Sequence, residues 1–292
     1  MKLPIFQFSL SMLIAGTIGV FAMKSELTPE RLVFFRCFFA AITMLIYCAY
    51  NRRRIQIPKI SMELLYVIFG GLSLVSTWYC LFQAFELASI TIGILCYFTA
   101  PFYVLILGSV LMRENVQVSM FAWLFLAFLG IIIAAANGID VIDGADLYIG
   151  VVFGLLAGLF YAIATLFGKK IKFYPPEYIS LLQMCIGALF FSFFIDFSLQ
   201  SIELKSWVYV LILGIVHTAI LYVLFYKSLK SIPIILIAPL MYIEPVIAIA
   251  SDIIVYKSHF GIMKFLGIIL VLLATFKISR ENVRITQYPD KE

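Results

Sequence analysis

The stretch TPERLVFFR, residues 28–36, recurs in outline as PPEYISLLQ, residues 175–183. In both copies a proline and a glutamate precede an apolar segment, and a polar residue follows the glutamate after six positions, Arg36 in one and Gln183 in the other. Each copy stands at the start of a segment long enough to cross a membrane. The chain is therefore predicted to consist of two similar halves, which is a common plan for secondary transporters.

A second pair of matches supports this division. Pro101 and Arg113 in the first half correspond to Pro245 and Lys257 in the second, at a spacing of 144 residues. The same spacing relates Trp78 to Tyr222. A further repeat, residues 128–132 against 265–269, has a spacing of 137 residues, and in a chain so rich in Leu, Ile and Phe it could be a chance duplicate.

The composition assigns the chain to the membrane. It is 64% hydrophobic and 13% charged over 292 residues, whereas soluble domains contain about 25% charged residues. A net charge of +5 spread over short loops gives no reason to expect a nucleic-acid partner. The five cysteines lie in apolar segments without a CxxC pattern, so neither disulfides nor a metal site is expected.

Crossing the hydrocarbon core takes about 20 apolar residues in a helix. Segments of this kind predict an all-α polytopic membrane protein with ten transmembrane helices, at residues 4–23, 32–50, 63–85, 89–111, 118–137, 147–167, 178–195, 206–227, 233–256 and 260–278. Most of the 21 Lys and Arg residues fall on the side of the N-terminus, which predicts that both termini are cytoplasmic.

Five spans per half is an odd number, so the second half should enter the membrane in the opposite direction to the first. This predicts two inverted five-helix repeats related by an axis in the membrane plane. Their expected limits are residues 1–138 and 139–280, followed by a cytoplasmic tail at 281–292.

Three motifs resemble those of a known family. They are Pro29 leading to Arg36, the stretch 97–101 (YFTAP) leading through twelve residues to Glu114, and the stretch 242–245 (YIEP). Together and in this order they resemble the ten-span EamA-type transporters of the drug/metabolite transporter superfamily. The resemblance covers essentially the whole chain. It implies a carrier of amino acids, other small metabolites or drugs in a bacterial inner membrane, with no cofactor.

The chain departs from the family pattern at two places. Ser258 stands where the resemblance predicts a glutamate closing the ninth span, so a scheme with matched acids at both repeat ends is in doubt. The first span also lacks the glutamate that the small multidrug-resistance relatives use, which excludes proton/drug exchange through that position.

Glu244 is the leading candidate for the chemistry, because an ionisable group inside a membrane is costly and is a functional hypothesis by default. It lies roughly 15 Å along the ninth span, close to the midplane. Pro245 removes a backbone donor next to it, and such broken helices often line substrate sites. Glu244 is interpreted as a proton carrier or a cation partner; the alternative is a carboxyl that only holds helices together.

His217 and Arg36 are the other ionisable candidates. His217 lies near the middle of the eighth span and would suit a proton relay if it faced Glu244; the alternative is a hydrogen bond to a Ser, Thr or carbonyl group. Arg36 could bind a substrate carboxylate with two parallel hydrogen bonds. A structural role, reaching the outer interface or pairing with Glu30, is favoured for it.

Five aromatic residues at central depths, in spans three, four, eight and nine, are candidates to line a cavity for an amphipathic solute. They are Trp78, Tyr79, Tyr97, Tyr222 and Tyr242. Helix packing is the favoured alternative for any single one. The spacing of Gly150, Gly154 and Gly158 predicts a close-packing seam, with Ala15-Gly16 and Gly19 of span one as its partner.

The expected function is therefore secondary transport of a small solute by alternating access, with export as the expected direction and coupling to protons left open. The expected partners are the substrate and the lipid bilayer, and the protein is expected to be a monomer or a weak homodimer. A lipid flippase or a passive channel remains an alternative. A membrane-embedded enzyme is less favoured because no cluster such as HxxxD or DxxD is found.

Overall fold

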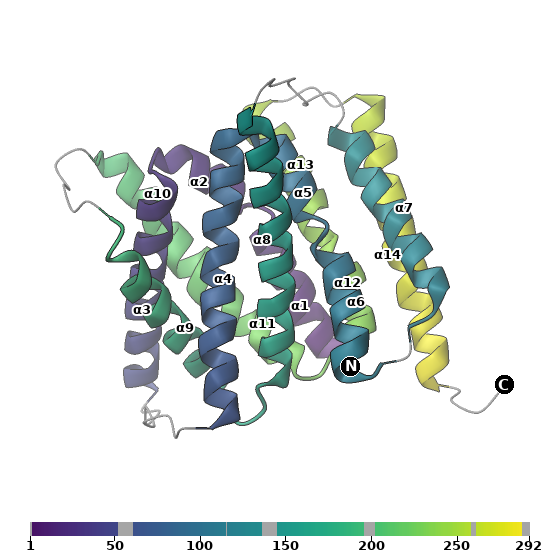
Figure 1. The fold of residues 1–292 in the computed structure, drawn as a ribbon, viewed down its shortest axis with the longest axis horizontal. Coiled ribbons are helices and arrows are strands. Elements are labelled where there is room, and N and C mark those ends of the chain that lie inside the picture. Colours follow the sequence, from purple (N-terminus) through teal and green to yellow (C-terminus); the bar gives the residue numbers. More distant parts are fainter. Residues whose placement is uncertain are drawn as a thin grey trace.

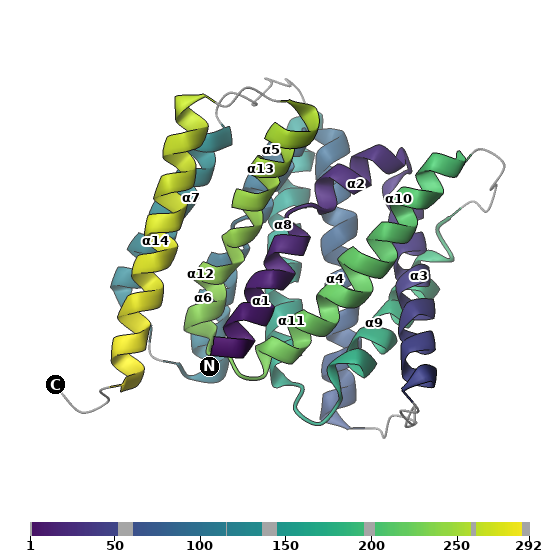
Figure 2. The ribbon, with the colours of Figure 1, turned by 180° about the vertical axis from the view of Figure 1, so that it is seen from behind.

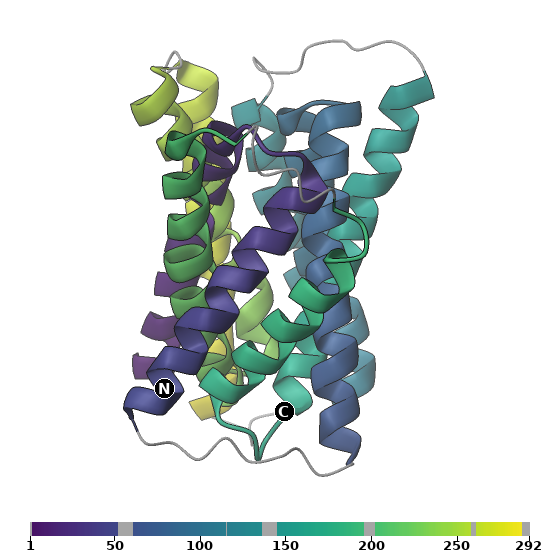
Figure 3. The same ribbon diagram turned by 90° about the vertical axis from the view of Figure 1, so that its left-hand side faces the viewer.

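A single bundle of helices makes up the computed structural model, which describes residues 2–51, 61–114, 116–135, 145–195, 202–257 and 261–287. The helices run alternately in opposite directions along it (Figures 1 and 2). α1 begins and α14 finishes at the same end, which we call the terminal end; the opposite end is called the far end. Figure 3 shows the bundle from the side, with α3 crossing it obliquely.

The helices of the two halves have the following bounds. The first half contains α1 (Lys2–Ala15), α2 (Ile18–Ser25), α3 (Pro29–Tyr50), α4 (Met62–Leu87), α5 (Ile90–Tyr97), α6 (Ala100–Met112) and α7 (Val118–Ala135). The second half contains α8 (Ala145–Lys170), α9 (Pro176–Phe191), α10 (Leu204–Gly214), the π-helix η3 (Ile215–Ile220), α11 (Leu221–Leu229), α12 (Ile234–Met241), α13 (Ile243–Tyr256) and α14 (Ile262–Gln287).

Eight of the ten predicted spans are long and apolar enough to cross a membrane, within the described ranges. They are Lys2–Ser25, Pro29–Tyr50, Met62–Leu87, Ile90–Met112, Val118–Ala135, Asp146–Lys170, Leu204–Leu229 and Ile234–Tyr256. α9 and α14 are not among them, and the 16 residues of α9 reach only about 24 Å. The prediction of ten spans is thus confirmed for eight. The expected boundary between the halves, 138/139, lies outside the described residues.

The two halves run in opposite directions. α1 runs from the terminal end toward the far end, whereas α8, the first helix of the second half, runs the other way (Figure 1). α4 packs along α8, and the corresponding pair from the exchanged halves, α11 and α1, also packs together. Arg113 and Lys257, which occupy corresponding positions, both adopt the left-handed conformation, with φ of 54° and 51°.

A pair of glycines marks where the two halves meet. Gly130 of α7 and Gly267 of α14 lie so close that a Cβ added to Gly267 would overlap the Gly130 carbonyl oxygen, and one added to Gly130 would be 2.7 Å from that of Gly267. Each glycine thus contacts the backbone of the other. The repeat with the 137-residue spacing therefore joins residues that lie face to face, and only glycine permits this approach of two helix backbones.

Replacing Gly267 with alanine is expected to destabilise the protein by about 1–3 kcal/mol, because the added methyl group overlaps backbone atoms that cannot move aside. The measurement is the midpoint of thermal unfolding in detergent. Gly19→Ala is the control, since a Cβ at Gly19 meets no atom within 4 Å. Equal midpoints for the two variants would contradict the close packing of α7 on α14.

Candidate functional site

A cavity of about 100 Å³ lies between the two halves, from the middle of the bundle toward the far end. Its walls come from α1, α2, α3, α4, α5, α8, α11 and α13. The lining residues are Ala15, Gly16, Ile18, Gly19, Val20, Met23, Arg36, Thr77, Trp78, Leu81, Phe82, Phe85, Ile90, Ile94, Tyr97, Phe98, Tyr161, Leu221, Tyr222, Glu244, Ala248 and Tyr256. Most are apolar or aromatic, and Arg36 and Glu244 are the one basic and the one acidic residue among them.

Two broken helices frame this cavity. The helix of the fourth span ends at Tyr97 and resumes at Ala100, and that of the ninth span ends at Met241 and resumes at Ile243. In both, a proline stands shortly after the break and cannot donate a hydrogen bond to the preceding turn. The break predicted at Pro245 is confirmed, and its counterpart lies before Pro101.

A glycine in the first span of each half packs against the break in the other half. A Cβ on Gly16 would lie 2.6 Å from the Glu244 carbonyl oxygen, and one on Gly158 would lie 2.9 Å from that of Tyr97. Each half thus supplies a glycine that contacts the broken helix of the other half. This close backbone approach fixes the position of Glu244 beside the cavity.

Arg36 is fully buried and its side chain is held by the second half. Its Nε donates to Thr218 Oγ1 at 3.1 Å, its Nη2 donates to the His217 carbonyl oxygen at 3.2 Å, and its guanidinium carbon lies 3.9 Å from the centroid of the Trp78 ring. Its Nη1 has no hydrogen-bond partner among the residues that the structure describes. The alternatives of reaching the interface or pairing with Glu30 are wrong, because Arg36 is inaccessible and the Glu30 carboxylate instead accepts from Gln83.

The partners of Arg36 lie on a π-helical turn that the sequence did not predict. From Ile215 to Ile220 the backbone is wound as a π-helix. Such a turn widens the helix and frees carbonyl groups for other partners, and it occurs frequently at functional sites. Here the freed carbonyl of His217 accepts from Arg36, so the irregular backbone is what positions the guanidinium at the cavity.

His217 points away from Glu244. Its Nε2 lies 2.8 Å from Thr17 Oγ1, and its Nδ1 lies 3.4 Å from the Ile212 carbonyl oxygen. Its ring also packs against Phe21, with centroids 4.7 Å apart. Both ring nitrogens are thus directed at groups other than Glu244, which corresponds to the hydrogen-bonded alternative. The imidazole connects the break in the first span to the π-helical turn.

Glu244 lies in the first turn of α13, and the Tyr97 hydroxyl is close enough to its carboxyl to interact with it. Tyr161 is close enough to interact with it electrostatically, and the Tyr161 hydroxyl also contacts Met12 Sδ at 3.9 Å. The two broken helices therefore meet through Tyr97 and Glu244. Neither Glu244 nor Arg36 is the other's hydrogen-bond partner, so the cavity presents a carboxyl and a guanidinium at separate points.

The predicted aromatic residues divide into two groups. Trp78 and Tyr222, at corresponding positions in the two halves, meet edge to face with centroids 5.6 Å apart and line the cavity together with Tyr97. Tyr79 packs instead against the rings of Phe153 and Phe191. Tyr242 is buried at the helix break, and no described residue forms a hydrogen bond with its hydroxyl. Neither of these two lines the cavity.

Sequence reasoning missed the contribution of the first span and of Tyr161. Six lining residues come from residues 15–23. None of them is polar, and Gly16 and Gly19 have no side chain, so the sequence did not indicate a cavity wall there. The predicted partner of the glycine seam was wrong. Gly150, Gly154 and Gly158 pack against Ala88, Cys96 and the Tyr97–Ala100 break of the fourth span.

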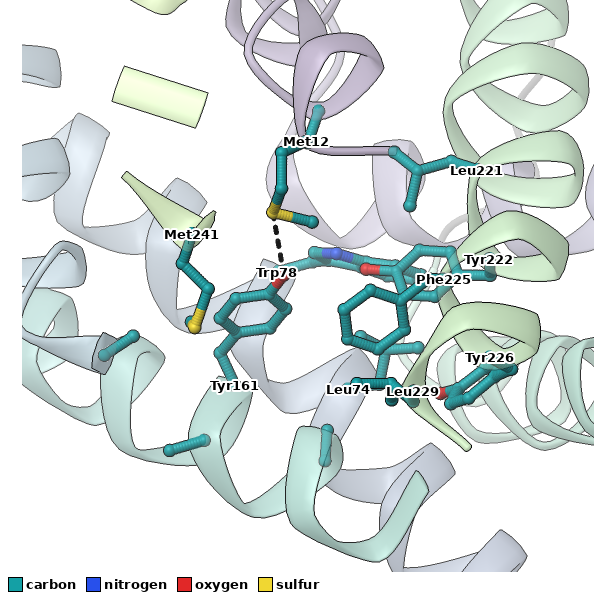
Figure 4. Close-up of a cluster of buried hydrophobic side chains, with 14 of the residues drawn as sticks. Met12, Leu74, Trp78, Tyr161, Leu221, Tyr222, Phe225, Tyr226, Leu229 and Met241 are labelled. Carbon is teal, nitrogen blue, oxygen red and sulfur yellow. Dashed lines mark hydrogen bonds between the residues drawn. The ribbon is translucent and has the colours of Figure 1, made fainter. Parts of the chain in front are cut away.

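A cluster of buried side chains lies on the terminal-end side of the cavity (Figure 4). Phe225 is at its centre, stacked on Phe8 with centroids 5.5 Å apart and on Tyr161 at 6.2 Å. Met12 and Met241 fill the space beside them, as the close-up shows. We call this group the aromatic plug. Apart from Tyr161, the residues of the plug do not line the cavity, whose other lining residues lie toward the far end.

No group of three or more His, Cys, Asp or Glu side chains is arranged to hold a metal ion within the described part of the chain. The features that the site does offer are one buried guanidinium with a free donor, one carboxyl beside two tyrosines, and aromatic walls. These features suit recognition of an organic solute.

Comparisons with known proteins agree on one family. The model of the EamA-like transporter family matches residues 2–136 and 148–280. The uncharacterized transporter YxxF of Bacillus subtilis (strain 168) is 32% identical over 273 residues, 91% of this chain and 86% of its own length. An uncharacterized transporter of Archaeoglobus fulgidus is 29% identical over 241 residues, 82% of each chain.

A solved crystal structure has the same fold, with a TM-score of 0.82 over 96% of this chain and 97% of its own, at 13% identity. Two matched segments of the family model, one in each half, agree with the repeat seen in the sequence and in the helix packing. The chain is therefore a multi-pass membrane protein that belongs to the EamA-like transporter family.

Proposed function

We propose that the protein is a secondary transporter that moves a small carboxylate-bearing solute across a bacterial inner membrane by alternating access. The observation that carries this proposal is the buried Arg36 guanidinium at the cavity, whose Nη1 lacks a partner. A buried cation without a counter-ion is strongly unfavourable, and a substrate carboxylate would relieve this cost through charge-assisted hydrogen bonds.

Glu244 gives the cavity a second polar point that suits the other end of an amino-acid-like solute. A substrate ammonium could bind its carboxylate while the substrate carboxylate binds Arg36. The rings of Trp78 and Tyr222 offer an apolar surface between these groups. Amphipathic or drug-like acids of similar size fit the same arrangement, apart from the ammonium contact.

Glu244 is also the proposed site of proton coupling, as a group that alternately binds a proton and the substrate. The titratable groups that face it are Tyr97 and Tyr161, and Tyr222 and Arg36 share its cavity. His217 is left out of this role because its ring nitrogens face Thr17 and Ile212.

The proposed orientation places the terminal end in the cytoplasm, following the distribution of Lys and Arg. The cavity then faces outward, and the aromatic plug forms the inner gate. The expected direction of transport, export, stays a prediction.

The test is uptake of labelled amino acids, carboxylic acids and amines into liposomes containing the purified protein, with and without a pH gradient. We expect saturable uptake of one carboxylate-bearing class and none of the simple amines. Uptake that rises linearly with concentration would favour a passive facilitator over a carrier. Transport of amines in preference to acids would contradict the assignment of Arg36.

A further inference from the structure

Glu114 joins the two halves at the terminal end. Its Oε1 accepts from the backbone N–H of Ile234 at 3.2 Å, and its Oε2 accepts from that of Ile235 at 3.4 Å. These are the first two amides of α12, which have no partner within their own helix. A carboxylate at a helix N-terminus is also favoured by the helix dipole. Glu114 follows α6, so one carboxylate of the first half caps a helix of the second.

The two helices joined by this contact also pack tightly. A Cβ added to Gly108 of α6 would lie 2.6 Å from Ile234 Cγ2. Lys169 of α8 adds a further connection, since its Nζ donates to the Ile232 carbonyl oxygen just before α12 and interacts electrostatically with Glu114. These contacts hold together α6 and α12, which are the parts of the two broken helices nearest the terminal end.

The corresponding helix start at the far end is capped differently. α5 begins at Ile90, 144 residues before the start of α12, and its own Ser89 hydroxyl accepts from the Ile92 N–H at 3.2 Å. α12 follows Pro233, whose side chain cannot cap it. In the sequence, Ser258 occupies the position that corresponds to Glu114. Within the described residues the two ends are therefore unequal: a carboxylate of the other half caps α12, whereas a serine of its own segment caps α5.

We propose that Glu114 is a latch of the inner gate. Its carboxylate favours the state closed at the terminal end, and it must leave the α12 N-terminus before the cavity can open there. The asymmetry between the ends biases the resting protein toward the state with its cavity at the far end. This inference rests on the alternating access proposed above, but its test requires no substrate.

The experiment measures labelling of single cysteines by a membrane-impermeant thiol reagent. The five native cysteines are first replaced with alanine. Leu229→Cys reports on the terminal end, because Leu229 is fully buried there. Gly19→Cys reports on the cavity, where a Cβ at this position meets open space. Each reporter is measured with Glu114 intact, with Glu114→Ala and with the milder Glu114→Gln, which keeps one acceptor oxygen.

Glu63→Ala is the matched control. The Glu63 carboxylate also accepts from two backbone amides at the terminal end, those of Lys172 and Phe173, both at 3.1 Å. It connects α4 to the segment after α8, however, and these two helices pack together along their length. Removing this contact loosens the same end but leaves the contact between Glu114 and α12 in place.

We expect Glu114→Ala to raise the labelling rate of Leu229→Cys at least about tenfold, since hydrogen bonds to a charged group contribute roughly that factor or more each. Glu114→Gln should give a smaller rise, Glu63→Ala none, and Gly19→Cys should be labelled more slowly as the far end closes. An unchanged rate at Leu229→Cys, or an equal rise with Glu63→Ala, would overturn the latch. The labelling test needs no substrate, so a protein that transported none of the tested solutes would still give these results. Failure of the proposed transport function and failure of the proposed role of Glu114 can therefore be told apart.

Discussion

Replacing Arg36 with glutamine is expected to lower the uptake of a carboxylate-bearing substrate by about a hundredfold or more. The change removes the buried guanidinium of a cavity-lining residue, and with it two proposed charge-assisted hydrogen bonds to a bound carboxylate. Arg36→Lys keeps the positive charge but lacks the planar fork, so it should restore only part of the activity. The measurement is initial uptake into liposomes, normalised to the amount of folded protein.

Arg36 also holds the π-helical turn, so a loss of activity alone would not separate binding from structure. The separating measurement compares the substrate with its amide, which lacks the carboxylate charge. Wild-type protein should prefer the acid strongly, whereas Arg36→Gln should treat the two alike. Thr218→Val is the structural control, since it removes one partner of Arg36 and leaves the guanidinium in place. An Arg36→Gln variant that still preferred the acid to the amide would refute the proposed role of Arg36.

Glu244→Gln is expected to reduce transport of a zwitterionic substrate at least about tenfold and to abolish stimulation by a pH gradient. Glutamine has nearly the same shape, so the change removes the charge and the exchangeable proton while leaving the backbone packing against Gly16. Loss of one charge-assisted contact corresponds to roughly this factor. The measurement is uptake with and without an imposed pH gradient.

Glu86→Gln is the control for this experiment. Glu86 is an exposed acid in the last turn of α4 and does not line the cavity. Its replacement should leave both uptake and pH stimulation unchanged. If Glu244→Gln behaved in the same way, Glu244 would have neither a binding nor a coupling role. Reduced uptake with pH stimulation preserved would limit Glu244 to substrate binding.

The sequence predicted those features that depend on local chemistry. Pro245 predicted where the ninth span is interrupted, because a proline blocks a hydrogen bond within its own segment. The 144-residue spacing also related Trp78 to Tyr222, and these two rings meet. Repetition carries this information because corresponding residues that lie close to the axis relating the two halves meet across it.

Features that depend on long-range packing could not be predicted in the same way. Arg36 bonds to residues 181 and 182 positions away, and only the folded bundle reveals that its partners lie on a π-helical turn. The glycine seam of α8 was assigned to the wrong helix, because small residues occur in several spans and spacing alone does not select among them. The first span was not predicted to line the cavity, because its glycines leave room for the cavity but carry no polar group that the sequence would reveal.

The central claim is that a solute binds at the Arg36 cavity and is carried by alternating exposure to the two sides. Counterflow tests it most directly: liposomes are loaded with excess unlabelled substrate, and entry of the labelled substrate is followed without any other gradient. The account predicts transient accumulation of label above its external concentration in wild-type liposomes, and none with Arg36→Gln. Label that only equilibrates in wild-type liposomes, with no overshoot, would contradict a carrier and indicate a passive pathway.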